Sequence, residues 1–149
     1  MKRRNHGFTL VEILIVVIIL GILAAIVIPQ FANASAQSKN SSVASTLQTL
    51  RSQLALFTSQ HSDVPPQITG MTAWGIMLNK STTTETTVAA PSGTLFGPYF
   101  SYAPSNPLNN LTGVSTAASD TTAGWYYTAT TDVYTIQARN LDGTVNTSY

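Results

Sequence analysis

The chain has 149 residues, of which 44% are hydrophobic and only 9% are charged. This length suits one ordinary domain, or one small domain with an extension. The absence of cysteine excludes disulfide bonds, thiolate zinc sites and thiol nucleophiles. Beyond Gly7, four basic residues face six acidic ones, a formal charge of −2, so this part has no basic patch for nucleic acid. A surface with so few charges is weakly repulsive and permits self-association.

A short basic segment opens the chain and a long apolar run follows it. Lys2, Arg3 and Arg4 precede the run, which extends from Phe8 to Ile28. As an α-helix, these roughly 21 residues measure about 31 Å, enough to cross the ~30 Å apolar core of a bilayer. The basic residues would keep the N-terminus in the cytoplasm. The segment therefore predicts a membrane helix.

Two simpler interpretations compete with a functional membrane helix. One is a secretory signal peptide cut in Ala32-Asn33-Ala34 or Ala34-Ser35-Ala36, which would release a globular protein. The other is a plain signal anchor. Neither explains Glu12, which lies inside the apolar run. A carboxylate within the membrane costs roughly 2.5–3.5 kcal/mol on insertion scales, so Glu12 is a functional candidate that needs a partner.

The segment Gly7-Phe8-Thr9-Leu10-Val11-Glu12 resembles the processing signal of type IV prepilins and type II secretion pseudopilins. The resemblance covers the basic leader, the Gly-Phe junction, Glu12, the unbroken apolar helix and Pro29. It implies that a prepilin peptidase cuts between Gly7 and Phe8 on the cytoplasmic side and methylates the new amine of Phe8. It also implies that Glu12 aligns an incoming subunit during filament assembly.

Simple electrostatics agrees with that role for Glu12. The free amine of Phe8 would be cationic at neutral pH, and a carboxylate facing a cation in a low dielectric is far better off than one alone. The amine could belong to a neighbouring subunit. Alternatively, Glu12 folds back on its own N-terminus.

Pro29 predicts a helix boundary or a bend between Ala25 and Pro29, because its ring clashes with the carbonyl of Ala25. The residue is thus either the simple end of the membrane helix or a functional kink.

A second helical half is expected after the membrane segment. Apolar residues recur at helical spacing on one face: Val43, Leu47, Leu50, Leu54 and Phe57. We expect one helix from Phe8 to Ser62, ending at Asp63-Val64-Pro65-Pro66. Its apolar stripe is either a coiled-coil seam or a face that packs on a sheet, and packing on the sheet is favoured because the heptads are too few for an independent coiled coil. His61 is expected at the surface, with no chemistry assigned.

The remainder predicts a small α+β head. Residues 71–78 suggest a short helix, 95–100 the start of a strand and 112–124 a loop. Alternating patterns at 125–128 and 133–138 predict two strands joined through 129–132. Two or three antiparallel strands would cover the helix, giving an α+β fold of the type IV pilin-like kind.

The head resembles the major pseudopilin of type II secretion more weakly, through Gly97-Pro98-Tyr99, Asn106-Pro107 and Asp132-Val133-Tyr134-Thr135. Many members of that family bind calcium in the C-terminal loop. The resemblance makes a calcium site conceivable here, though the acidic residues are sparse. The alternative is ordinary turn chemistry, which Asp142-Gly143 fits. The candidate calcium ligands are Asn106, Asn109, Asp132 and Asp142.

The sequence thus predicts four segments: a leader (1–7), a transmembrane and filament-core helix (8–29), an amphipathic helix (30–62) and an α+β head (63–149). Enzyme motifs are absent, so we expect a structural subunit and not an enzyme. The resemblance implies a homopolymeric filament, a prepilin peptidase, an inner-membrane assembly platform, a cytoplasmic ATPase and membrane lipid as partners. A secretion pseudopilus is favoured over a type IV pilus for adhesion, motility or DNA uptake.

Overall fold

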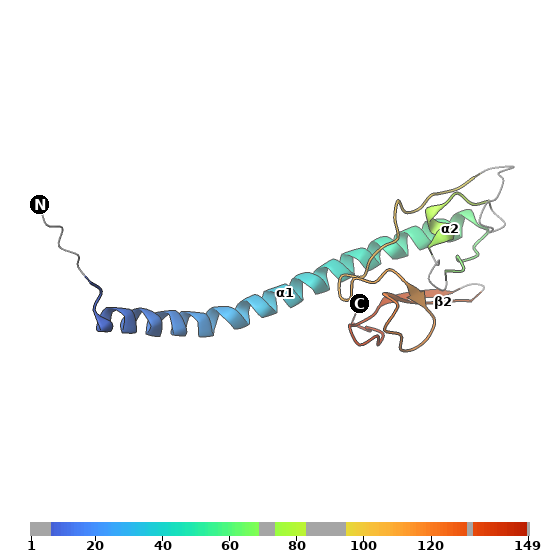
Figure 1. Ribbon diagram of the computed structural model, residues 1–149. Coiled ribbons are helices and arrows are strands. Elements are labelled where there is room, and N and C mark those ends of the chain that lie inside the picture. The colour runs from blue at the N-terminus through green and yellow to red at the C-terminus, as the bar shows by residue number, and fades with distance from the viewer. Residues whose placement is uncertain (1–6, 69–73, 83–94, 131–132, 149) are drawn as a thin grey trace, which may run out of the picture. The chain divides into compact units, whose positions relative to one another are not determined.

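The computed structural model describes residues 7–68, 74–82, 95–130 and 133–148 (Figure 1). Helix α1 (Leu10–Gln60) is followed by helix α2 (Gly75–Leu78) and by strands β1 (Val114–Ser115), β2 (Trp125–Ala129) and β3 (Tyr134–Ala138). The chain divides into two compact units, residues 1–38 and 39–149, and α1 contributes residues to both.

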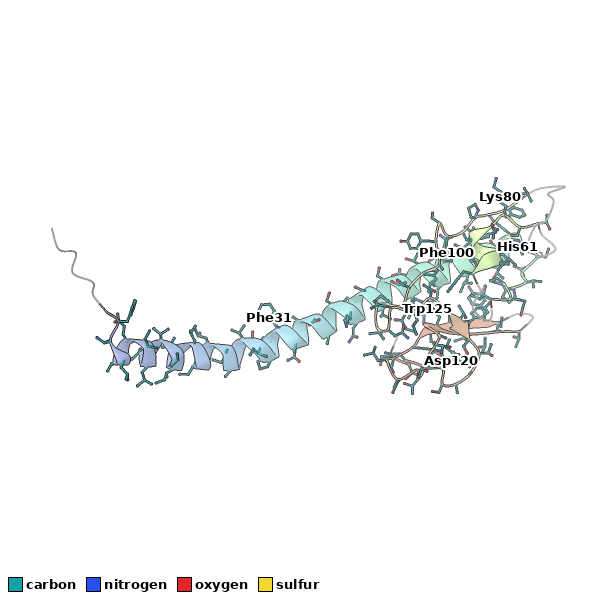
Figure 2. All side chains as sticks on the ribbon, viewed as in Figure 1. Phe31, His61, Lys80, Phe100, Asp120 and Trp125 are labelled. Carbon is teal, nitrogen blue, oxygen red and sulfur yellow. The ribbon has the colours of Figure 1, made fainter. Side chains whose placement is uncertain are left out.

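In the first unit, every described side chain of α1 is exposed. The apolar side chains from Leu10 to Ile28 lie open on all sides of the helix, and Phe31 is 71% exposed (Figure 2). The helix is long and apolar enough to cross a membrane, with a mean hydropathy of 3.3 in its most apolar window. A helix that is apolar all round requires lipid or other apolar helices around it.

In the second unit, one face of α1 supplies the helical half of the core. The predicted stripe is fully buried, which confirms its helical spacing: Val43, Leu47, Leu50, Leu54 and Phe57. These side chains form one hydrophobic cluster with Trp125, Tyr127 and Ile136 of the sheet and with Met77 of α2. The expected α+β fold, a long helix packed on a small sheet, is therefore confirmed.

The sheet is mixed and has the strand order β1-β2-β3. The hairpin of β2 and β3 is antiparallel, as the alternation predicted, and its register pairs Tyr127 with Ile136. The all-antiparallel expectation is wrong, however, because β1 pairs with β2 in parallel, and β1 lies inside the predicted loop 112–124. Two residues are too few for an alternating pattern to reveal such a strand.

A glycine makes this close return possible. The N–H groups of Gly124 and Trp125 both donate to the carbonyl of Gly113, at 2.9 and 3.0 Å. A Cβ atom on Gly124 would lie 2.0 Å from the carbonyl oxygen of Leu111, a distance that no side chain tolerates. Only glycine lets the chain enter β2 at this point.

The expected strand start at 95–100 is also wrong. A single antiparallel bridge joins Ser81 and Phe96, and Gly97 then turns the backbone with φ +80°. Helix α1 ends at Gln60, two residues before the expected limit, because Ser62 and Asp63 adopt positive φ values of 57° and 63°. The N–H of Asp63 donates to the carbonyl of Thr58 at 3.0 Å and closes the last turn.

Arg139 is the largest charged side chain buried in the head. It is 0% exposed and donates to four backbone carbonyls, those of Trp125 and Ser115 at 3.4 Å, Gly143 at 2.6 Å, and Ala117. Its guanidinium also lies 5.6 Å from the ring centre of Tyr126. The planar guanidinium thus joins β1, β2 and the C-terminal turn through one set of donors.

We predict that Arg139→Met destabilises the head by about 3 kcal/mol or more, because hydrogen bonds from a charged donor are worth roughly 1.5–3 kcal/mol each. Chemical unfolding of the full chain in detergent, followed by the fluorescence of Trp74 and Trp125, measures the change. Lys80→Met is the control, since Lys80 is exposed and its replacement should cost less than about 0.5 kcal/mol. Equal midpoints for wild type and Arg139→Met would contradict this role.

Candidate processing and assembly site

The segment that carries the predicted junction lies open at the start of α1. Gly7 and Phe8 precede the helix and both are exposed, Phe8 to 79%. A Cβ atom on Gly7 would meet no atom within 4 Å. The peptide bond between these two residues is thus not shielded by the described part of the chain.

Thr9 and Glu12 form a cap at the N-terminus of α1. The Thr9 hydroxyl accepts a hydrogen bond from the Glu12 N–H at 3.2 Å and donates toward Glu12 Oε2 at 3.5 Å. A hydroxyl that satisfies a free N–H of the first turn, with a Glu three residues later, is a capping box pattern. The carboxylate therefore has a local partner on its own chain, and it remains exposed.

The contact between Thr9 and Glu12 was missed by our sequence analysis, although the Thr-x-x-Glu spacing before an apolar run is its usual signal. This contact is relevant to both interpretations of Glu12, which are pairing with a neighbouring subunit and folding back on its own N-terminus. The carboxylate contacts its own N-terminal turn through Thr9, and the carboxylate still lies at the surface, where another molecule can reach it.

Pro29 lies within α1, which continues without interruption from Leu10 to Gln60. The simple end of a helix at Pro29 is therefore wrong. The proline removes one intrahelical donor, so the helix is locally weakened even where it remains continuous. The functional kink remains a prediction.

His61 is fully buried, so the prediction that it lies at the surface is wrong. Its ring stacks on Phe57 with centroids 3.7 Å apart. Nδ1 lies 2.8 Å from the carbonyl of Phe57, and Nε2 lies 2.8 Å from the hydroxyl of Ser81. His61 follows the end of α1 (Figure 2) and joins it to Ser81, a partner 20 residues away that no local pattern indicates.

The first candidate calcium ligand, Asn106, is held by hydrogen bonds within the protein. Asn106 is 0% exposed, and its amide nitrogen donates to the carbonyls of Gly124 and Arg139, both at 2.7 Å. Its side-chain oxygen accepts from the N–H of Leu108 at 2.9 Å. A buried amide with all these partners stabilises the loops that it connects, and it does not fit the ligand set of a calcium site.

Two of the other candidate ligands, Asn109 and Asp142, follow the same pattern. Asn109 Oδ1 accepts from the N–H of Leu111 at 3.1 Å, and Asp142 Oδ1 accepts from the N–H and hydroxyl of Thr144 at 3.0 and 2.6 Å. Asp132 lies outside the described residues. Within the described residues, no group of three acidic, histidine or cysteine side chains could hold a metal. The described residues therefore favour turn chemistry.

Two carboxylates flank one bridge of the C-terminal turn. Asp120 donates its N–H to the carbonyl of Gly143 at 3.0 Å, next to Asp142. The Thr122 hydroxyl, then the Ser115 hydroxyl and the Thr122 N–H, lower the pKa of Asp120 to about 2. The Thr144 hydroxyl and N–H likewise lower the pKa of Asp142. The ionised forms of both side chains are therefore favoured in the folded head.

Comparison with known proteins agrees with these features. Residues 2–28 match the family model of the prokaryotic N-terminal methylation motif. The type II secretion system core protein G of Aeromonas hydrophila is 31% identical over 111 residues, which cover 73% of this chain and 71% of that protein. The chain belongs to the type IV pilin-like family and is similar to its pseudopilins.

Other relatives of this pilin-like chain align over shorter stretches. The core protein G of Dickeya chrysanthemi is 35% identical over 83 residues, covering 56% of this chain and 52% of that protein. The type IV major pilin PilA of Myxococcus xanthus is 51% identical over 59 residues, covering 40% of this chain and 24% of the pilin. The chain thus spans about half or less of these two relatives. No solved structure matches it significantly.

We predict that Asp120 contributes to the acid sensitivity of the pilin-like head. Because its folded pKa of about 2 is below its usual value of 3.8, the stabilisation is present above pH 4 and is lost as the pH falls toward 2. Asp120→Asn keeps an acceptor for Thr122 and does not titrate, so its unfolding temperature should fall less between pH 5 and pH 2.

Thermal unfolding of the full chain in detergent at both pH values measures this difference. Asp142 titrates in both proteins, so the comparison isolates Asp120. Parallel losses in the wild type and in Asp120→Asn would contradict the assignment.

Proposed function

We propose that this chain is a structural subunit of a type IV pilin-like filament, with no catalytic step of its own. The observation that carries the proposal is the exposed apolar surface of α1 directly after Gly7 and Phe8. The large apolar side chains from Leu10 to Ile28 are 43–82% exposed, an arrangement that is stable only in lipid or among other apolar helices. While the precursor is held in the inner membrane, lipid would surround this helix. In the filament core, the apolar helices of identical subunits would surround it.

Processing gives the precursor its assembly function. A prepilin peptidase would cut after Gly7 on the cytoplasmic side, where the basic leader holds the N-terminus. The new amine of Phe8 then carries a positive charge close to Glu12. Between subunits, the pair of Glu12 and a neighbour's Phe8 amine would reward correct alignment, since an unpaired charge in this apolar layer is costly. An assembly platform and a cytoplasmic ATPase would drive the extraction from the membrane.

A secretion pseudopilus is the better-supported filament. The alignment with the Aeromonas hydrophila core protein G covers 111 residues, more than helix α1 can contain, so it extends into the head. The pilin of Myxococcus xanthus aligns over 59 residues only. The second candidate, a type IV pilus, is favoured by the higher identity of that shorter match.

A deletion strain that retains exported proteins in its periplasm would support the pseudopilus, and loss of surface filaments alone would support the pilus.

We predict that the mature chain begins at N-methylated Phe8. Intact mass and tandem mass spectrometry of native membranes and of sheared filaments measure the N-terminal residue. A chain that begins at Ser35 or Gln37 would instead indicate a conventional secreted protein, and the filament proposal would then be wrong. An intact Met1 in sheared material would contradict processing by the peptidase.

We predict that Glu12→Gln is inserted and cut normally but forms at least about tenfold fewer filaments, because the amine of a neighbouring Phe8 loses its counterion in an apolar layer. Filaments are counted by electron microscopy, and processing is checked by mass spectrometry.

Thr9→Val is the matched variant, since it removes the hydroxyl that contacts Glu12 and keeps the charge. If Glu12 serves only its own cap, the two variants should assemble equally. A clearly stronger defect in Glu12→Gln is the expected result, and normal filament numbers in that variant would refute the pairing.

A further inference from the structure

A groove on the head lies between α1 and the loop 99–107. Its volume is about 450 Å³, and none of its lining residues is charged. Helix α1 forms one wall with Ser45, Thr46 and Thr49, and the loop forms the other with Tyr102 and Ser105. Tyr102 is 78% exposed, so a large aromatic ring projects into solvent beside the groove. Exposed tyrosines of this kind are typical anchors of protein interfaces.

The loop wall is held firmly in place. The N–H groups of Tyr99 and Phe100 donate to the carbonyl of Met77 at 2.8 and 3.1 Å. The indole of Trp125 donates to the carbonyl of Pro104 at 2.9 Å, and the ring of Phe100 packs edge-on against Trp74. The groove therefore exists before any partner binds, which lowers the entropic cost of binding.

We propose that a second copy of this chain covers this groove in the assembled filament. The inference rests on the proposed function, because α1 provides both the groove wall and the apolar segment that the filament would bury among copies. Adjacent copies that align their α1 helices would bring protein against this wall. Apart from the buried Leu50, this wall carries small Ser and Thr side chains, which allow a neighbouring backbone to approach closely. With no charge in the groove, identical copies meet there without repulsion.

The test uses the absence of cysteine from the chain. Ser105→Cys introduces a single thiol in the groove, and Lys80→Cys introduces one at an exposed position that does not line it. Both variants are labelled with a bulky maleimide, once as full-length chains in detergent and once as purified filaments. We expect Ser105→Cys to react about tenfold more slowly in filaments, as a site inside an interface core should, and Lys80→Cys to react at similar rates in both.

Equal labelling of Ser105→Cys in filaments and in detergent would overturn the proposal and leave the groove open to another partner. Equal protection of both positions would also overturn it, because the whole head would then be shielded. If the chain forms no filaments at all, the proposed function fails, which is a different result from an accessible groove within intact filaments.

A second pair of variants tests the same contact without new thiols. Tyr102→Ala truncates the exposed ring beside the groove, and Val133→Ala truncates an apolar side chain that is 65% exposed elsewhere on the head. We expect fewer or shorter filaments for Tyr102→Ala only, with unchanged unfolding midpoints for both chains. Normal filaments for Tyr102→Ala would contradict the role of the ring.

Discussion

One helix with two different surfaces determines most of this molecule. Before Pro29, α1 is apolar on every side and exposed, whereas after Lys39 it has a single buried stripe and a polar opposite face. Among the described residues, the stripe supplies five of the fifteen buried residues in the hydrophobic cluster of the head. Without that third of its core, a three-stranded sheet of this size would have little apolar surface to bury. The head therefore depends on the same helix that carries the assembly signal.

The short strands leave the head with many backbone groups to satisfy by other means. Polar side chains donate hydrogen bonds to backbone carbonyls in the loops, as Arg139 and Asn106 show. Aromatic side chains contribute as well, since the indole of Trp74 donates to the carbonyl of Thr112 at 2.7 Å and the hydroxyl of Tyr127 to that of Pro66 at 2.7 Å. Within the described residues, every buried side-chain nitrogen and oxygen has a partner. The loops are thus fixed by specific hydrogen bonds where regular strands are lacking.

Sequence patterns predicted the parts of the fold that repeat at a fixed period. The helical stripe from Val43 to Phe57 and the hairpin of β2 and β3 both follow such periods, and both are present. The parallel strand β1 was missed because two residues carry no period. His61 and Arg139 were missed for a related reason, since their partners lie far away along the chain or are backbone carbonyls. Such pairings depend on the folded topology, which no local window contains.

The site at the start of α1 differs from the head because its chemistry is local. Thr9 and Glu12 meet within one helical turn, and the spacing that brings them together can be found in the sequence. The local contact and the proposed contact between subunits do not exclude each other. The cap holds the carboxylate at the first turn, close to where the Phe8 amine is created by processing. A preplaced carboxylate loses less conformational entropy when a second subunit binds it.

This arrangement addresses a weakness of apolar assembly. Hydrophobic contacts between helices with only apolar side chains are strong but not directional. Identical helices could therefore slide past one another with little change in buried area. Within the apolar run, Glu12 is the only charged side chain, and the next charged residue after it is Lys39. In the proposed filament, a single carboxylate would therefore select one register among many of similar apolar contact, as a buried polar residue does in a coiled coil. The apolar surface would supply the affinity, and the one charge the alignment.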